Sequence, residues 1–219
     1  MIVMGIDLSG PSNPKDTVIS IFEKVNGSLR FRQLISGATD EVILSQIKRE
    51  VENDSVFVGI DSPLSYQDGG GDRKADKSLR AYIKSLGMNT SSVMSPTMNR
   101  MAYLTLRGIA LTRSIDSLKT DRPIKVVEVH PGAVMGSRIP DELLPHLLEY
   151  KRSEDSQKQI FHFLQSTDLN ELPNEAGSST HAIDACAAAL GAWHWGDPYL
   201  EPNWCQKAVP PHHPFDFCC

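Results

Sequence analysis

The chain has 219 residues, of which 40% are hydrophobic, and this is enough to bury a core within one domain. Its formal net charge of -5 argues against a dedicated nucleic-acid-binding protein with a basic surface. This exclusion weakens if carboxylates hold divalent cations, which would bring the charge close to neutral and would attract phosphate. No apolar run has the length of a membrane span, and no signal-peptide pattern is present, so we expect a soluble, cytoplasmic protein. The four cysteines form no disulfide framework.

The first 63 residues predict three antiparallel strands, a helix and a further strand. Residues 2–7 are a short apolar run, and residues 17–25 and 27–35 alternate between apolar and polar side chains on either side of a turn. Residues 39–53 begin with Thr39 as a candidate N-cap and have the apolar spacing of an amphipathic helix. The apolar run 55–61 is stopped by Pro63, and we expect it to be a buried strand parallel to the first.

The second part of the chain predicts a helical insertion, one more strand and several helices. The insertion covers about residues 69–122 and starts with the flexible segment GGGD. The segment 124–132 is predicted to be another strand, cut off by a proline, 140–166 to be mostly helical and 179–195 to be a helix of small residues. We expect residues 1–200 to form one domain, followed by a Pro-rich tail over 201–219.

This order of elements predicts an α/β fold of the ribonuclease H type. We expect a mixed five-stranded sheet, in which three antiparallel strands are followed by parallel strands, with helices on both faces and a helical insertion.

Acidic residues stand at matching places in the predicted sheet. Asp7 and Asp61 end buried strands, Glu128 lies near the end of a third, and Asp184 follows the start of the alanine-rich helix. The carboxyl ends of parallel strands share one edge of a sheet, so these acids are expected to converge. Mg²⁺ or Mn²⁺ would neutralise their mutual repulsion, and His181 shares a helix face with Asp184. A single Asp at a strand end is more often a turn residue, and Glu128 alone would fit a buried ion pair.

Four motifs carry a resemblance to a known family. They are VMGIDLSG, VFVGIDSPLS, KVVEVHPGAVMG and HAIDACAAALGAW, and together they extend from residue 2 to about residue 195. The set resembles the domain-of-unknown-function family 429, described as predicted nucleases of the ribonuclease H-like superfamily. The last motif is also similar to the final motif of RuvC-type Holliday-junction resolvases. The resemblance implies a ribonuclease H-like fold, with metal-binding acids at Asp7, Asp61, Glu128 and Asp184.

The expected function is a metal-dependent nuclease that hydrolyses phosphodiester bonds of RNA or DNA. In this hypothesis the four acids hold the metal and His181 assists proton transfer. Ser9 and Gly10 leave room for a phosphate, and the best candidates for phosphate contacts in the insertion are Arg73, Arg80 and Arg100. A charge run on a helix is more often a solvated face, and Asp76 and Arg80 have the spacing of an i,i+4 ion pair.

Two alternatives stay open at this point. The first is a phosphotransferase or ATPase, in which Ser9 and Gly10 approach a nucleotide phosphate. The chain length disfavours it, because such enzymes close two domains over the nucleotide. The second is a non-catalytic nucleic-acid-binding protein that has kept the fold, although such a protein gains nothing from four mutually repelling acids.

Overall fold

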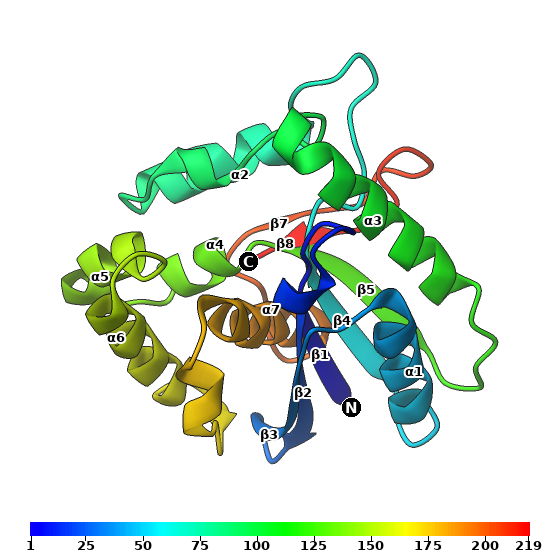
Figure 1. Ribbon diagram of the computed structural model, residues 1–219, viewed down its shortest axis with the longest axis horizontal. Coiled ribbons are helices and arrows are strands. Elements are labelled where there is room, and N and C mark those ends of the chain that lie inside the picture. The colour runs from blue at the N-terminus through cyan, green and yellow to red at the C-terminus, as the bar shows by residue number, and fades with distance from the viewer.

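The five predicted strands form the centre of the sheet in the computed structural model, which describes residues 1–219 (Figure 1). Strand β1 pairs antiparallel with β2 and β2 with β3, while β4 and β5 continue from β1 in parallel. The α/β class and the predicted strand directions are therefore confirmed. The bounds of these strands are β1 Ile2–Asp7, β2 Val18–Val25, β3 Ser28–Ser36, β4 Val56–Asp61 and β5 Ile124–Val129.

The number of strands is larger than predicted, because three short strands extend the sheet to eight in the order β6-β3-β2-β1-β4-β5-β8-β7. They are β6 Leu169–Asn170, β7 Cys205–Gln206 and β8 Phe217–Cys218. Two residues are too few to show an alternating pattern in a sequence. The Pro-rich tail thus returns to the sheet, where β8 pairs with the end of β5 at Glu128.

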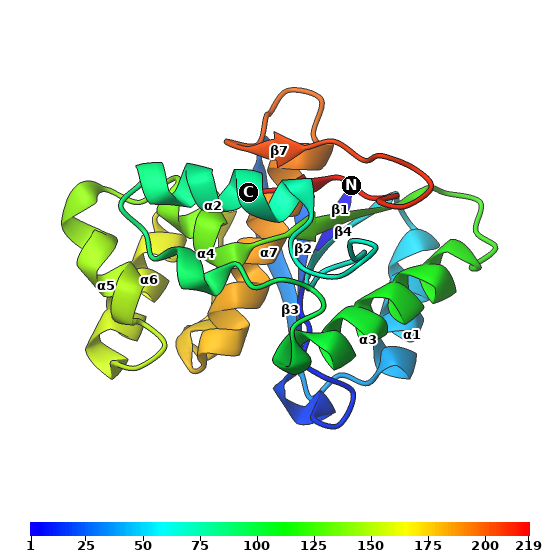
Figure 2. The ribbon, with the colours of Figure 1, turned by 90° about the horizontal axis from the view of Figure 1, so that it is seen from above.

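The helices form a layer on each face of the sheet (Figure 2). Helices α1 Asp40–Val51 and α3 Asn99–Asp116 cover one face. The opposite face carries α7 Thr180–Gly196. Three further helices lie on that side: α4 Pro131–Gly136, α5 Leu144–Glu149 and α6 Glu154–Gln165. Of these, α4 and α6 pack against α7. A hydrophobic core lies on each face of the sheet, and β1 contributes side chains to both. Ile2, Met4 and Ile6 pack on the α1 side, and Val3 packs on the α7 side.

Helix α7 lies unusually close to the sheet because both surfaces are made of small residues. Its start is capped by Ser179, whose hydroxyl accepts a hydrogen bond from the Ala182 amide. A Cβ atom at Gly5 in β1 would collide with the carbonyl oxygen of Ala185, and one at Gly59 in β4 would collide with that of Ala188. Glycine on the strands therefore lets the backbone of α7 contact the sheet. This contact places Asp184 of α7 close to Asp7 and Asp61, which end the same two strands.

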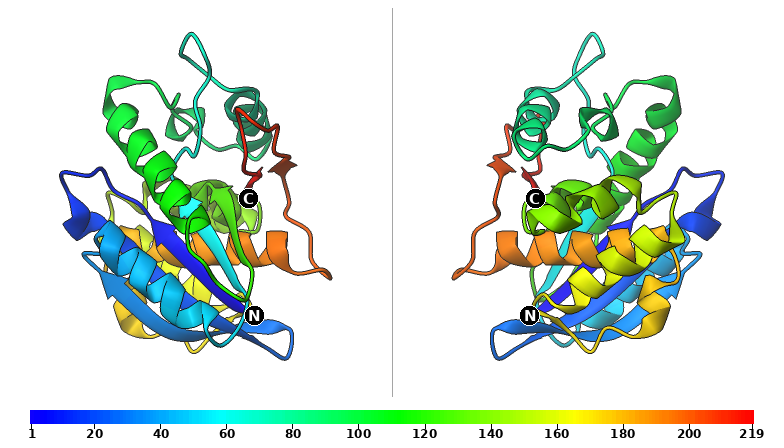
Figure 3. Two further views of the ribbon diagram at one scale, coloured as in Figure 1. Left: turned by 90° about the vertical axis from the view of Figure 1, so that its right-hand side faces the viewer. Right: turned by 90° about the vertical axis from the view of Figure 1, so that its left-hand side faces the viewer.

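The predicted insertion is helical and stands above the sheet (Figure 3). It contains α2 Lys74–Ser85 and α3, joined by a short 3-10 turn at Thr90–Ser92. Helix α3 leaves the insertion to pack on the sheet through Leu111 and Ile115. In none of the helices do length and apolar character together reach what a bilayer crossing requires.

Candidate metal centre

Three carboxylates meet at the carboxyl end of the central strands. Asp7 and Asp61 are the last residues of β1 and β4 and are direct partners in the parallel register, so their side chains leave the sheet on the same face. Asp184 reaches the same place from α7. One carboxylate oxygen of each residue lies within 4.8 Å of the others. We call Asp7, Asp61 and Asp184 the three-carboxylate cluster.

Burial and mutual repulsion disfavour negative charge in the cluster. The pKa of Asp61 is raised well above its usual range, first by burial and then by the charges of Asp7 and Asp184. Burial also raises the pKa of Asp7, although a hydrogen bond from His181 acts in the opposite direction. Additional positive charge would therefore stabilise the ionised form of the cluster.

Three neighbouring side chains offset part of this negative charge. His181 Nδ1 lies 2.6 Å from Asp7 Oδ2, and this contact raises the histidine pKa. Asp184 accepts a hydrogen bond of 2.6 Å from the Tyr150 hydroxyl and forms an ion pair of 2.8 Å with Lys151 Nζ. Burial lowers the pKa of Lys151, but the carboxylates of Asp184 and Asp61 outweigh it and raise that pKa overall. Asp61 has no such partner in hydrogen-bond or ion-pair contact.

The donor set of the cluster fits a divalent cation. Three carboxylate oxygens that all lie within 4.8 Å of one another need only small movements to share one ion, because hard cations take oxygen ligands at about 2.0–2.6 Å. The lack of a charge partner for Asp61 leaves an oxygen donor available. The cluster could therefore hold a metal ion through Asp7, Asp61 and Asp184.

Glu128 does not join the cluster, because the pleat of the sheet directs it to the other face. In the register of β4 and β5 it is the partner of Ile60, not of Asp61. There it receives two hydrogen bonds from Arg73, at 2.7 Å to Oε2 and 2.5 Å to Oε1, and one from the Leu64 amide. The buried-ion-pair interpretation of Glu128 matches this arrangement.

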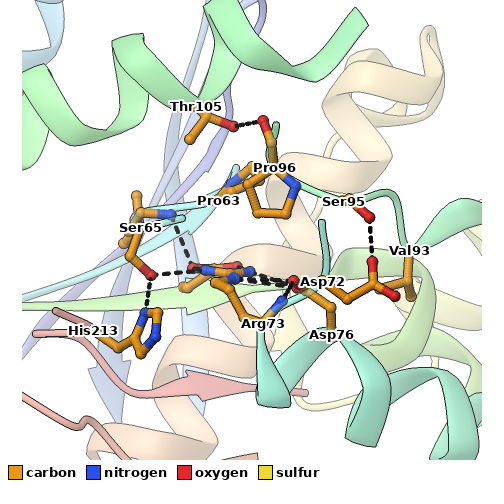
Figure 4. Close-up of polar contacts among 12 residues, drawn as sticks. Pro63, Ser65, Asp72, Arg73, Asp76, Val93, Ser95, Pro96, Thr105 and His213 are labelled. Carbon is orange, nitrogen blue, oxygen red and sulfur yellow. Dashed lines mark hydrogen bonds and ion pairs between the residues drawn. The ribbon is translucent and has the colours of Figure 1, made fainter. Parts of the chain in front are cut away.

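Arg73 is the centre of a hydrogen-bond network around Glu128, and Figure 4 shows Arg73 between Ser65 and Asp76. Its guanidinium also binds Asp76 and donates to the Ser65 hydroxyl, which contacts His213 at 2.9 Å. The Arg73 side chain is only 5% exposed. The predicted phosphate contact therefore has no support at Arg73, whose donors hold Glu128, Asp76 and the C-terminal tail together. We call Arg73, Asp76, Glu128, Ser65 and His213 the arginine network.

The other predicted phosphate ligands differ in how much of them is available. Arg80 pairs with Asp72, not with the predicted partner Asp76, which is taken by Arg73. Arg100 is exposed, forms no ion pair and lines the cavity that opens over the three-carboxylate cluster. Only Arg100 of the three thus has both a free guanidinium and access to the cavity.

Ser9 and Gly10 form part of a closed loop. The Ser9 hydroxyl donates to the carbonyl oxygen of Asn13 at 2.6 Å and contacts the Thr17 hydroxyl at 2.7 Å. Arg107 donates to the Ser9 carbonyl oxygen and to Thr17. The cavity above the three-carboxylate cluster is lined by Asp7 and Leu8 but not by Ser9 or Gly10. The predicted phosphate contact therefore has no support at Ser9 and Gly10.

A cavity of about 750 Å³ opens over the three-carboxylate cluster. The insertion supplies one wall with Ser91, Met94 and Arg100, and the turn after α5 supplies another with Lys151 and Arg152. Basic side chains therefore line both walls of the cavity, and the three carboxylates form its floor. Its volume falls in the range of cavities that hold small-molecule ligands.

Tyr150 and Lys151 are site residues that sequence reasoning missed. They follow α5 within a polar stretch and carry no motif. Tyr150 is separated from its partner Asp184 by 34 positions in the sequence. His130 was also missed, and its pKa is lowered by burial beside the cavity. A tyrosine and a lysine in a surface-polar segment give no local signal of such a role.

The fold and the site define a mixed α/β protein with a buried three-carboxylate cluster at the carboxyl ends of parallel strands. The family described as "Protein of unknown function (DUF429)" matches residues 5–203, and the chain belongs to this family. Comparison with curated proteins and with solved structures returned no match.

Proposed function

We propose that the protein is a metal-dependent nuclease that hydrolyses phosphodiester bonds of RNA or DNA, with Mg²⁺ or Mn²⁺ as its cofactor and a ribonuclease H-like fold as its framework. The observation that carries the proposal is the three-carboxylate cluster beneath an open cavity, with its oxygen donors within 4.8 Å of one another. Two general rules support it: clustered carboxylates bind hard divalent cations, and such cations serve phosphoryl chemistry.

Each group of the site has a defined task in this proposal. Asp7, Asp61 and Asp184 would hold the cation. A divalent cation bound there stabilises negative charge on the phosphate and assists the activation of water. His181 is held at Nδ1 by Asp7, which leaves Nε2 to accept or return a proton. Arg100 and Arg152 at the cavity would bind phosphate groups on either side of the scissile bond.

The phosphotransferase alternative has less support from the same residues. It needs Ser9 and Gly10 to approach a nucleotide phosphate, but the Ser9 hydroxyl is used within its own loop. ATP should therefore give no thermal stabilisation beyond that of free Mg²⁺.

Cleavage of a defined panel of nucleic acids tests the proposal. The panel contains single-stranded, double-stranded, hybrid and branched RNA and DNA, each with Mg²⁺, Mn²⁺ or EDTA. We expect metal-dependent cleavage of at least one member and a loss of about 100-fold or more in rate for Asp7→Asn. The matched control is Asp121→Asn, an exposed carboxylate outside the site, which should keep full activity. An intact panel with both metals would exclude nuclease activity and favour the non-catalytic binding protein.

A further inference from the structure

Lys151 Nζ forms an ion pair of 2.8 Å with Asp184 and thereby supplies a positive charge to the three-carboxylate cluster. We propose that Lys151 is the internal counter-cation of this cluster, and that a divalent cation binds by displacing the lysine ammonium from Asp184. The inference rests on the proposed function, because it assumes that the cluster takes a cation. It assigns to Lys151 a positioning role: the side chain sets how tightly the cation is held.

The contacts of the two partners are unequal. The Asp184 side chain is only 2% exposed, fixed on α7 and bound by Tyr150, whereas the Lys151 side chain is 59% exposed. Lys151 lies in the turn between α5 and α6, and its ammonium forms a single ion pair. The lysine can therefore leave by rotation of its own side chain, while the carboxylate stays in place.

The charges around the cluster explain why the ammonium and a divalent cation would compete. Lys151 interacts favourably with Asp184, Asp61 and Asp7, so its charge is shared by the whole cluster. His181 contacts Asp7 from the other side, and Asp61 has no cationic partner in contact. A divalent cation at these oxygens would satisfy all three acids and repel an ammonium within a few ångströms. Both cations cannot occupy Asp184 at full strength.

A purely structural ion pair predicts the opposite result from a displaced counter-cation. If Lys151 only held α5 to α7, its removal would disorder Asp184 and weaken cation binding. If Lys151 competes with the cation, its removal strengthens cation binding although the metal-free protein becomes less stable. The direction of the change in metal affinity therefore separates the two roles.

Calorimetric titration with Mn²⁺ at pH 8, without nucleic acid, measures that direction. We expect Lys151→Met to bind Mn²⁺ about tenfold more tightly than the unchanged protein, because a unit positive charge beside the site is gone. Thermal unfolding should show a lower melting temperature for this variant without metal and a larger rise with Mn²⁺. Lys158→Met is the matched control: Lys158 is an exposed lysine on α6 without an ion pair, and its loss should leave the Mn²⁺ affinity unchanged.

A second variant keeps the test decisive if Lys151→Met folds poorly. Lys151→Arg retains the charge, so its Mn²⁺ affinity should stay within about threefold of the unchanged protein. Equal or weaker Mn²⁺ binding by Lys151→Met would overturn the counter-cation role alone. Absence of Mn²⁺ and Mg²⁺ binding in every protein, including the unchanged one, would overturn both this role and the proposed function.

Discussion

The three-carboxylate cluster and the arginine network both line the cavity at the carboxyl end of the central strands, but their acids have opposite charge environments. In the arginine network, Glu128 and Asp76 are buried and are both bound by the Arg73 guanidinium. In the cluster, Asp61 has no cationic partner in contact, and Lys151 reaches Asp184 from a mostly exposed position. The first arrangement is complete within the protein, whereas the second lacks positive charge.

This difference separates acids that hold the fold from acids that are available to a ligand. A buried carboxylate with a bidentate arginine is already satisfied, and binding anything else there would first break two strong hydrogen bonds. A carboxylate in a crowded group with a raised pKa gains free energy from a cation. Four substitutions test this difference between the two groups of acids.

The largest effect is expected for Arg73→Met. Removing the guanidinium leaves Glu128 and Asp76 buried without their partner, which should lower the free energy of unfolding by about 3–5 kcal/mol. Urea unfolding followed by circular dichroism measures the change. Arg113→Met, at an exposed arginine on the same insertion, should change the stability by less than about 0.5 kcal/mol. Similar small losses for both variants would show that the arginine network does not hold the fold.

Gly59→Ala should damage the cluster while sparing the arginine network. The added Cβ collides with the Ala188 carbonyl and pushes α7 away from β4, at a cost of about 1–3 kcal/mol. Because Asp184 moves with α7, the thermal stabilisation by Mn²⁺ should also be reduced. Gly10→Ala, where nothing lies within 4 Å of the new atom, serves as the control. An unchanged Mn²⁺ response in a destabilised Gly59→Ala protein would show that cation binding does not depend on the packing of α7.

Asp61→Asn is expected to change stability in the opposite direction from Arg73→Met. The amide removes one charge from a buried, repulsive group, so the metal-free protein should gain roughly 1 kcal/mol. It also removes one ligand, and the thermal shift with Mn²⁺ should fall. Differential scanning calorimetry with EDTA and with Mn²⁺ gives both values. A metal-free protein destabilised by this substitution would mean that the charge of Asp61 is already compensated.

Asp72→Asn should have a smaller effect on stability than Arg73→Met, and one that depends on pH. Hydrogen bonds from Arg80 and Ser95 lower the pKa of Asp72 from 3.8 to about 2. Its ionised form therefore stabilises the folded protein fully above about pH 4, and this contribution is lost as the pH falls towards 2. The variant should be about 1–2 kcal/mol less stable at pH 6 and no less stable near pH 2. Chemical unfolding at several pH values tests this, and a difference independent of pH would contradict it.

The sequence predicted the central sheet well because its signals are local. Apolar runs predict β1, β4 and β5, and alternation on either side of a turn predicts β2 and β3. A run of small residues after a capping Ser or Thr predicts α7. The edge strands β6, β7 and β8 were missed because each pairs over only two residues. Their pairing depends on where distant segments arrive, which no local pattern records.

The site was predicted in part, and the difference follows from the alternation of side chains in a strand. Asp7 and Asp61 occupy matching positions in IVMGID and VFVGID, and the structure brings them together with Asp184. Glu128 lies one position out of step with Asp61, which turns it to the other face. Tyr150 and Lys151 could not be predicted, because their contacts with Asp184 join the turn after α5 to the distant helix α7.

The sequence alone predicts the five central strands and the main helices, and it places acids at the ends of two parallel strands. Those features follow from side-chain periodicity, capping and backbone sterics, which act over a few residues. The tertiary structure sets which acids share a face, which are paired with an arginine and which are in contact with a lysine or a histidine. Such choices depend on register and helix packing, because electrostatic contacts join residues that are far apart in the chain.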